Sequence, residues 1–291
     1  MAKVSICVPC YNNIDDVIRL IESIQNQTYT DYEIIINDDS EDESIASYIG
    51  DLSDDDFDED GIFEKIDYIH NVRKLGPVYN WNATLERAAG EYIKIMFSDD
   101  WFTYPDSLEK MVRMLDERPD AGLAFCGSRQ VTLGDVITEH NVSEEKTYDR
   151  YAPDDYIHAM YHDYKYLFIS NQIGAPSATI YRNSLHVKFN EKSNWASDVF
   201  LYMDILGKNP RFEYTKEPLI SIGMHENQYT ESFSSNDKRV FRDYKYMYKR
   251  YGLRHDKVYS EYYLNEYKKP YVIERVKAPC RKLRDGLKKR K

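Results

Sequence analysis

The stretch "DYEIIINDDSED", residues 31 to 42, decides the fold, because an unbroken apolar run ends abruptly in a cluster of acids. A continuous apolar run of this length is typical of a strand buried on both faces, as in a parallel sheet. Polar side chains that follow such a strand lie at the edge where open α/β sheets bind their ligands. The stretch therefore predicts both a fold class and the place of a site.

The segments on either side alternate between strand-like and helix-like patterns. Strand-like patterns occupy residues 3–9, 63–70, 91–97 and 122–128. Helix-like patterns lie between them, at residues 14–24, 43–52, 77–90 and 105–115. This alternation predicts right-handed crossovers and a mostly parallel sheet with helices on both faces.

Past residue 130 the pattern changes. We expect a hairpin around Leu133, Gly134 and Asp135, a strand over 177–182 and a helix from about Ser197. Because there is neither an internal repeat nor a low-complexity linker, we predict one domain over residues 1–230. A helical, Tyr-rich extension with a basic tail is predicted over residues 231–291.

Composition excludes some classes of protein. The net charge of -11 argues against a nucleic-acid binder, because phosphate backbones require a basic face. The polar start "MAKVSICVPC" lacks the features of a signal peptide, and no apolar run has the length of a membrane span. With four cysteines in 291 residues, a disulfide framework is not indicated, so we expect a cytoplasmic protein.

The C-terminal tail has the opposite charge. Residues 268–291 hold eleven Lys or Arg and two acids, interspersed with apolar residues. Such segments lie on anionic membrane surfaces, which predicts a peripheral position on the inner face of the membrane. The alternative is a disordered, solubilising end, because Pro279 and Gly286 interrupt any long helix.

Three polar clusters follow predicted strands: "PCYNN" at 9–13, "NDDSED" at 37–42 and "SDDW" at 98–101. If they converge, four carboxylates surround one crevice, namely Asp38, Asp39, Asp99 and Asp100. Carboxylates that close repel one another unless a proton or a cation intervenes. Carboxylates together with substrate phosphates are what Mg²⁺ or Mn²⁺ prefers. The alternative is that both Asp pairs are strand-end turns.

These motifs resemble a known family. The stretches "VPCYNN", "INDDSED", Leu75 through "GEYIKI", and "SDDW" followed by "PDSLEKMV" are similar to glycosyltransferase family 2, the inverting nucleotide-sugar enzymes of the GT-A fold. The resemblance implies a GT-A domain over 1–230, with a nucleotide-sugar half at 1–120 and an acceptor half at 121–230. It also implies transfer of a sugar from a nucleoside diphosphate, with uracil the favoured base and thymine, which presents a similar edge, the alternative.

The resemblance also implies roles for single residues in the donor half. Nucleotide-sugar binding falls to Pro9 and Tyr11, which would flank the base, and to Asn12, Asp38, Asp39 and Asp99. Metal binding, to Mn²⁺ or Mg²⁺, falls to Asp99, Asp100 and His225. The family often has a further acid where this chain has Phe97, so fewer carboxylates would hold the metal.

In the acceptor half, the segment "NWASDVFLYMDIL" makes Asp198 the implied catalytic base, which would take the proton of the acceptor hydroxyl. The alternative is that Ser197 or Asp198 caps the helix. Asp204 is expected on the solvated face of that helix. "GAPSATIYR" implies contacts of Gly174, Pro176 and Ser177 with the acceptor or donor sugar, or else a turn that leads into a strand.

The implied reaction builds a surface polysaccharide on a glycan or a polyprenyl-linked saccharide. Two alternatives stay open. A catalytically silent nucleotide- or sugar-binding module is supported by Phe97. A nucleotidyltransferase would usually have a glycine-rich, basic phosphate loop near the first strand, which "PCYNNIDD" is not.

Overall fold

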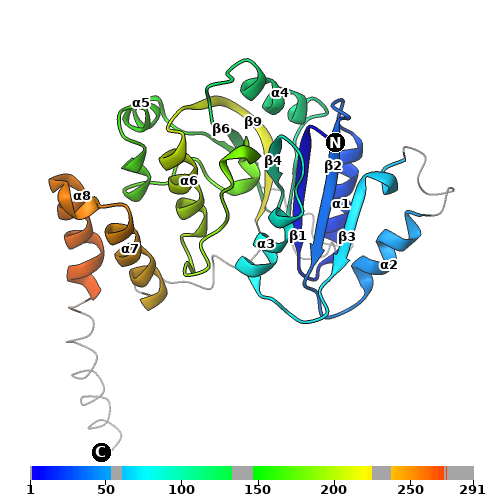
Figure 1. Cartoon of the computed structure of the whole chain (residues 1–291), viewed down its shortest axis with the longest axis horizontal. Coiled ribbons are helices and arrows are strands. Elements are labelled where there is room, and N and C mark those ends of the chain that lie inside the picture. Colours follow the sequence, from blue (N-terminus) through cyan, green and yellow to red (C-terminus); the bar gives the residue numbers. More distant parts are fainter. Residues whose placement is uncertain (1, 54–60, 133–146, 225–236, 272, 274–291) are drawn as a thin grey trace, which may run out of the picture.

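The computed structural model describes residues 2–53, 61–132, 147–224, 237–271 and 273. Within these residues one sheet of nine strands runs through the molecule in the order β3-β2-β1-β4-β8-β6-β9-β5, and β7 pairs with β6 (Figure 1). Helices cover both faces of this sheet, as the alternating pattern predicts.

The first half of the sheet is parallel. Its strands are β1 (Val4–Cys10), β2 (Tyr32–Asp38), β3 (Ile66–His70) and β4 (Tyr92–Ile95). Both β2 and β4 pair in parallel with β1, and β3 pairs in parallel with β2. Cys10 lies opposite Asp38 in the register, so β1 and β2 end level with each other. The predicted parallel sheet is confirmed, and the polar loops after β1 and β2 leave it at the same edge.

The second half of the sheet mixes both directions. Its strands are β5 (Asp100–Phe102), β6 (Leu123–Thr132), β7 (Thr147–Arg150), β8 (Thr179–Arg182) and β9 (Phe212–Met224). β8 is antiparallel to both β4 and β6, whereas β6 and β9 are parallel. β5 pairs antiparallel with β9, and β7 with β6. The predicted turn residues Leu133, Gly134 and Asp135 lie outside the described residues.

Alternation along the strands divides the core into two layers. Val4, Ile6 and Val8 of β1 face the layer that includes α1 (Ile14–Gln25), α2 (Ser44–Asp51) and α4 (Ser107–Asp116). Cys7, between them, faces the layer that includes α3 (Pro77–Glu86) and α6 (Ser197–Lys208). Each central strand is apolar on both sides because helices cover both sides.

The C-terminal region is helical and rich in tyrosine, as predicted. Its helices α7 (Lys238–Arg250) and α8 (Lys257–Tyr262), and a π-helix at Tyr263–Lys268, share one core layer with α6 and with α5 (Asp154–His162) from the middle of the chain. Figure 1 shows α7 and α8 at the opposite end of the molecule from α2. The predicted boundary at residue 230, and the tail beyond residue 273, lie outside the described residues. Short 3-10 turns occupy Phe63–Lys65, Tyr164–Phe168, Pro176–Ala178, Asn183–Leu185 and Leu253–His255.

Asp204 lies on the partly exposed side of α6, in keeping with the expected solvated face. There it accepts hydrogen bonds from Arg250 at 2.9 Å and from the Tyr251 hydroxyl at 2.8 Å. It therefore ties α6 to α7. In the part of the chain that the structure describes, no helix combines the length and the apolar character needed to cross a bilayer.

Candidate active site

The loops after β1 and β2 are tied together at the edge of the sheet. Asn12 has a left-handed backbone conformation with φ of 55°, which turns the chain sharply after β1. Its backbone N–H donates to the Ser40 hydroxyl at 2.7 Å, and its side-chain oxygen accepts from the Glu41 N–H at 3.2 Å. Two of the predicted polar clusters are thus brought into direct contact.

Asp38, in the second of these loops, is fully buried. It accepts hydrogen bonds from the backbone N–H of Ser40 at 2.9 Å and from the Tyr68 hydroxyl at 2.8 Å. These donors satisfy the buried carboxylate oxygens and fix the turn after β2. Asp38 therefore fixes the conformation of this loop from its buried side.

The neighbouring Asp39 organises the loop before α3. Its carboxylate accepts from the backbone N–H groups of Leu75 and Gly76 at 2.8 and 2.9 Å, and from the Asn71 amide at 3.0 Å. A carboxylate has about four acceptor positions. Asp39 therefore has capacity for one further donor, which is what contact with a nucleobase N–H requires.

Tyr11 stands at the outer side of this edge, with 45% of its surface exposed. Lys74 lies over the Tyr11 ring, 4.2 Å from its centroid, and donates to its hydroxyl at 2.6 Å. Glu41 accepts from both residues at 3.0 Å. Pro9 lies buried in β1. An exposed aromatic face, held in place and close to the Asp39 loop, offers a stacking surface for a planar base. Glu41 belongs to the predicted polar cluster "NDDSED" but was given no role there, and Lys74 carried no motif that sequence analysis could use.

The two adjacent carboxylates at the start of β5 differ in exposure. Asp100 is 3% exposed, whereas Asp99 is half-buried. Burial raises the pKa of Asp100 well above its usual range, and the charge of Asp99 raises it further. The Ser177 hydroxyl, the Lys94 ammonium and the Gly223 N–H oppose this rise. At Asp100, burial and the charge of Asp99 therefore outweigh the groups that favour the charged carboxylate.

Lys94 lies fully buried beneath this pair. Its ammonium donates to the backbone carbonyls of Ser177 and of Ile95, the latter at 3.4 Å. Burial lowers its pKa to about 7, against the opposing effects of Cys126 and Asp100. The sequence signal was a single lysine inside the apolar strand "YIKIMF", which sequence analysis passed over.

Phe97, where the family often has an acid, belongs to an aromatic wall. Its ring lies 5.1 Å from that of Trp81, which in turn lies 4.9 Å from that of Phe189. The Phe97 N–H donates to the Ser177 hydroxyl at 3.1 Å. The residue therefore supplies packing, and the acidic character of the loop comes from Asp99 and Asp100.

A divalent cation fits the chemistry of this loop. Mg²⁺ and Mn²⁺ are commonly held by one or two carboxylates together with substrate phosphates. Asp99 and Asp100 supply such carboxylates, and the raised pKa of Asp100 marks charge that a cation would relieve. No cluster of three or more His, Cys, Asp or Glu suited to a metal occurs among the described residues, and His225 lies outside them.

Asp198 lies in the first turn of α6, where the N-terminal end of the helix favours a negative charge. It is half-buried and accepts from the Asn171 amide at 2.6 Å and from the Val199 N–H at 2.8 Å. Burial nevertheless raises its pKa to about 6, although these bonds and the charge of Arg150 oppose the rise. The N-cap position is Ala196, so neither Ser197 nor Asp198 caps the helix.

The segment 171–177 connects Asp198 to the paired carboxylates. Asn171, which bonds Asp198, also accepts from the Gly174 N–H at 3.3 Å. Gly174 has φ of 95°, and its carbonyl accepts from the Tyr202 hydroxyl at 2.9 Å. The buried residues Pro176 and Ser177 follow, and Ser177 contacts Phe97 and Asp100. The predicted acceptor and metal residues thus belong to one connected region.

Asp243 of α7 anchors the start of α6 and was missed from the sequence. This fully buried carboxylate accepts from three consecutive backbone N–H groups, those of Asn194, Trp195 and Ala196, at 2.9, 2.7 and 3.1 Å. Two of these donors belong to the loop before α6 and the third to its N-cap residue, so Asp243 fixes the entry of the chain into the helix. A lone Asp in "FRDYKYMY" carries no local signal for a contact almost fifty residues away.

The sequence of this chain is similar to that of known proteins. Residues 5–188 match the model of the family described as glycosyl transferase family 2. A stretch of 101 residues is 36% identical to the GalNAc(5)-diNAcBac-PP-undecaprenol beta-1,3-glucosyltransferase of Campylobacter jejuni, and it covers 34% of this chain and 30% of that protein. Matches to the first curated relatives span 15% to 30% of their own length.

Solved structures resemble the fold. The chain superposes on TarS of S. aureus in complex with UDP-GlcNAc with a TM-score of 0.58 and 17% identity, over 81% of this chain and 63% of that one. A mannosyltransferase of Pyrobaculum calidifontis in complex with GDP-Man and Mn²⁺ gives a TM-score of 0.56 and 16% identity, over 78% and 59%. These similarities confirm the predicted GT-A fold.

Proposed function

The chain belongs to glycosyltransferase family 2, and on this premise we propose that it transfers a sugar from a UDP-sugar, with inversion at the anomeric carbon, to an acceptor hydroxyl. One observation carries the proposal. Asp198, a carboxylate with a pKa of about 6, is joined through residues 171–177 to the acid pair Asp99 and Asp100. An inverting displacement requires a base for the acceptor hydroxyl and a site for the leaving diphosphate, and this connected region offers a candidate for each.

The donor nucleotide lies, in this proposal, at the edge shared by β1 and β2. The base stacks on Tyr11, with Pro9 behind it, and its ring N–H donates to the remaining acceptor position of Asp39. Asn12 and Asp38 hold the two loops in place, and Asp99 reaches the ribose or the metal. Uracil supplies the N–H that Asp39 needs. In support, a structural relative, TarS, was solved with UDP-GlcNAc.

Transfer itself moves one proton and exchanges two bonds. Asp198 accepts the proton of the acceptor hydroxyl as the hydroxyl oxygen bonds to the anomeric carbon. The bond from that carbon to the diphosphate oxygen breaks on the opposite side, which inverts the configuration. Asp99 and Asp100 would hold Mn²⁺ or Mg²⁺, with His225 as a further predicted ligand, and the bound ion supplies positive charge to the leaving diphosphate.

We further propose that the acceptor is a glycan or a polyprenyl-linked saccharide in surface polysaccharide synthesis. Gly174, Pro176 and Ser177 shape the acceptor side, and the basic tail at 268–291 holds the protein on the anionic inner face of the membrane. The name of the Campylobacter relative, which refers to an undecaprenol-linked substrate, supports this acceptor class.

Release of nucleoside diphosphate from a panel of UDP-sugars and GDP-mannose, with Mn²⁺ and with water or added acceptor, tests the proposal. We expect turnover of a UDP-sugar, and a loss of at least about a hundredfold in Asp198→Asn with unchanged UDP affinity. Asp204→Asn, in the same helix, is the matched control. Equal turnover in wild type and Asp198→Asn would refute the assignment of the base. Nucleotide binding without turnover of any donor would indicate a silent binding module.

A further inference from the structure

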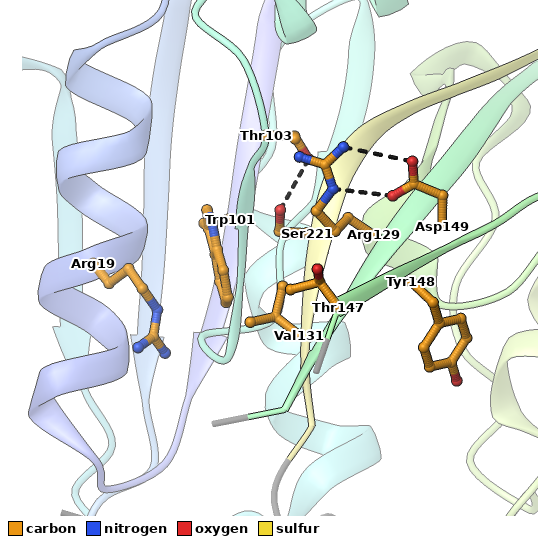
Figure 2. A pocket seen from close by; sticks show the side chains of 9 residues that line it. All are labelled: Arg19, Trp101, Thr103, Arg129, Val131, Thr147, Tyr148, Asp149 and Ser221. Carbon is orange, nitrogen blue, oxygen red and sulfur yellow. Dashed lines mark hydrogen bonds and ion pairs between the residues drawn. The ribbon is translucent and has the colours of Figure 1, made fainter. Parts of the chain in front are cut away.

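A cavity lies beside β5, and its lining includes none of the predicted donor residues (Figure 2). It has a volume of about 600 Å³, which is in the range of small-molecule sites. Its walls come from α1, β5, β6, β7 and β9. The lining residues are Arg19, Trp101, Thr103, Arg129, Val131, Thr147, Tyr148, Asp149 and Ser221. None of them belongs to the donor, metal or acceptor residues predicted above.

Aromatic rings and a guanidinium group form the sides of the cavity. Figure 2 shows Arg19 of α1 facing Trp101 of β5, and its guanidinium carbon lies 4.7 Å from the centroid of the Trp101 ring. Tyr148 of β7 is 58% exposed on the other side. Exposed aromatic faces stack on the apolar faces of sugar rings, as they do on other flat, partly apolar groups.

Polar groups in the cavity come as neighbouring donors and acceptors. Arg129 and Asp149 form an ion pair at 3.0 Å, and the hydroxyls of Thr103 and Ser221 lie 3.0 Å apart. The Nε of Arg19 is buried and has no hydrogen-bond acceptor among the residues that the structure describes. Rigid groups of both kinds side by side match the adjacent hydroxyls of a saccharide.

The charges in the cavity argue against a phosphate site. Arg129 is paired with Asp149, and Arg19 is paired with Asp16 within α1. Each positive charge is therefore offset by a carboxylate. A free phosphate or a diphosphate requires uncompensated positive charge, whereas a neutral, hydroxyl-rich ligand does not.

We propose that this cavity is a second saccharide-binding site, which holds a neutral oligosaccharide segment of the acceptor or product away from the sugar being transferred. Its role as an acceptor subsite rests on the proposed function. Trp101 follows Asp100 directly in β5, and Ser221 is paired with Trp101 in the register of β9. A bound saccharide would therefore contact the strand that presents the acid pair.

Isothermal titration of the full chain with chitotetraose, maltotetraose and laminaritetraose tests the site. Tyr148→Ala removes an exposed ring of the cavity, and Tyr151→Ala, 51% exposed and outside the cavity, is the matched control. We expect at least one tetrasaccharide to bind, with about tenfold weaker affinity in Tyr148→Ala and unchanged affinity in Tyr151→Ala. UDP affinity should be unchanged in both variants.

Three outcomes would overturn the proposal: no binding of any tetrasaccharide, equal affinity in Tyr148→Ala and wild type, or displacement of the saccharide by pyrophosphate. The test is independent of turnover. Saccharide binding that depends on Tyr148, in a protein that turns over no donor, would refute the proposed function and support the saccharide site. Donor turnover without saccharide binding would support the proposed function and refute the saccharide site.

Discussion

Carboxylates of the same chemical type have different surroundings here, and these surroundings suit them to different proposed roles. Asp39 accepts three hydrogen bonds from the chain, two of them from backbone N–H groups, and Asp38 is held by Ser40 and Tyr68. Asp198 is desolvated enough to have a pKa of about 6. A base is most effective when its pKa lies near the working pH, so Asp198 is the carboxylate suited to take a proton.

The pKa of Asp198 predicts how kcat depends on pH. The base works only when deprotonated, so kcat should rise about tenfold per pH unit below pH 6 and level off above it. Steady-state rates with saturating donor between pH 4.5 and 8 measure this. The residual rate of Asp198→Asn should lack this rise. A wild-type profile that is flat across the range would contradict the role of Asp198.

Lys94 makes a separate prediction about stability. Its pKa falls from the ordinary 10.5 to about 7, so between these values the unfolded chain binds more protons than the folded chain. The free energy of unfolding should therefore rise with pH in this window, by up to about 1.4 kcal/mol per pH unit, and Lys94→Met should lack this contribution. Urea unfolding of both proteins at pH 7, 8 and 9 compares the slopes. Equal slopes of unfolding free energy against pH in the two proteins would contradict the lowered pKa of Lys94.

At the scale of elements, the base depends on a helix that another helix holds. The N-terminal end of α6 is fixed by Asp243 of α7 through three backbone N–H groups, and Asp198 follows within the first turn. The same two helices also meet at Asp204 and Arg250, on the partly exposed side. The C-terminal helices therefore position the candidate base.

Removal of the Asp243 charge should thus affect stability and rate together. We expect Asp243→Asn to lower the free energy of unfolding by about 3 kcal/mol, because buried N–H donors lose their charged acceptor, and to lower kcat about tenfold. Asp204→Asn should cost less than about 1 kcal/mol and leave kcat unchanged. Denaturant unfolding and initial rates measure both effects. Similar losses of stability and of kcat in Asp243→Asn and Asp204→Asn would mean that the Asp243 contact only stabilises the packing of α6 on α7.

Local patterns explain which elements sequence analysis found. The strands β1, β2, β4 and β6 were predicted because an apolar run records burial on both faces within a few residues. The polar loops were placed at one edge because parallel strands end together. Lys94 and Asp243 were missed, since their partners lie far away in the sequence. The cavity of the proposed saccharide site was missed because its walls come from one helix and four strands.

At the scale of the whole molecule, the two halves meet at the acid pair. Asp100 receives hydrogen bonds from Ser177 and Gly223, both in the second half, while the nucleotide edge belongs to the first half. In the proposed function the diphosphate and these carboxylates hold one cation together, so binding of nucleotide and binding of metal should be coupled. Neither half alone contains both the base and the predicted donor site.

A thermal-shift titration tests this coupling. Ligand binding at a hundredfold excess over Kd stabilises a protein by about 2.7 kcal/mol. We expect UDP with Mn²⁺ to raise Tm by more than the sum of the separate shifts, and EDTA to remove the excess. Asp100→Asn should abolish the excess, whereas Asp106→Asn, at the half-buried N-cap position of α4, should keep it. Additive shifts in the wild type would argue against a shared metal.

Inversion of configuration is the central chemical claim, and the anomer formed first tests it most directly. Proton NMR, recorded within minutes of mixing the protein, Mn²⁺ and a UDP-sugar whose sugar is α-linked, follows the anomeric signal of the sugar transferred to water or acceptor. A single displacement assisted by Asp198 predicts that the β-anomer appears first. The α-anomer as the first product, formed at the rate of UDP release, would contradict the mechanism.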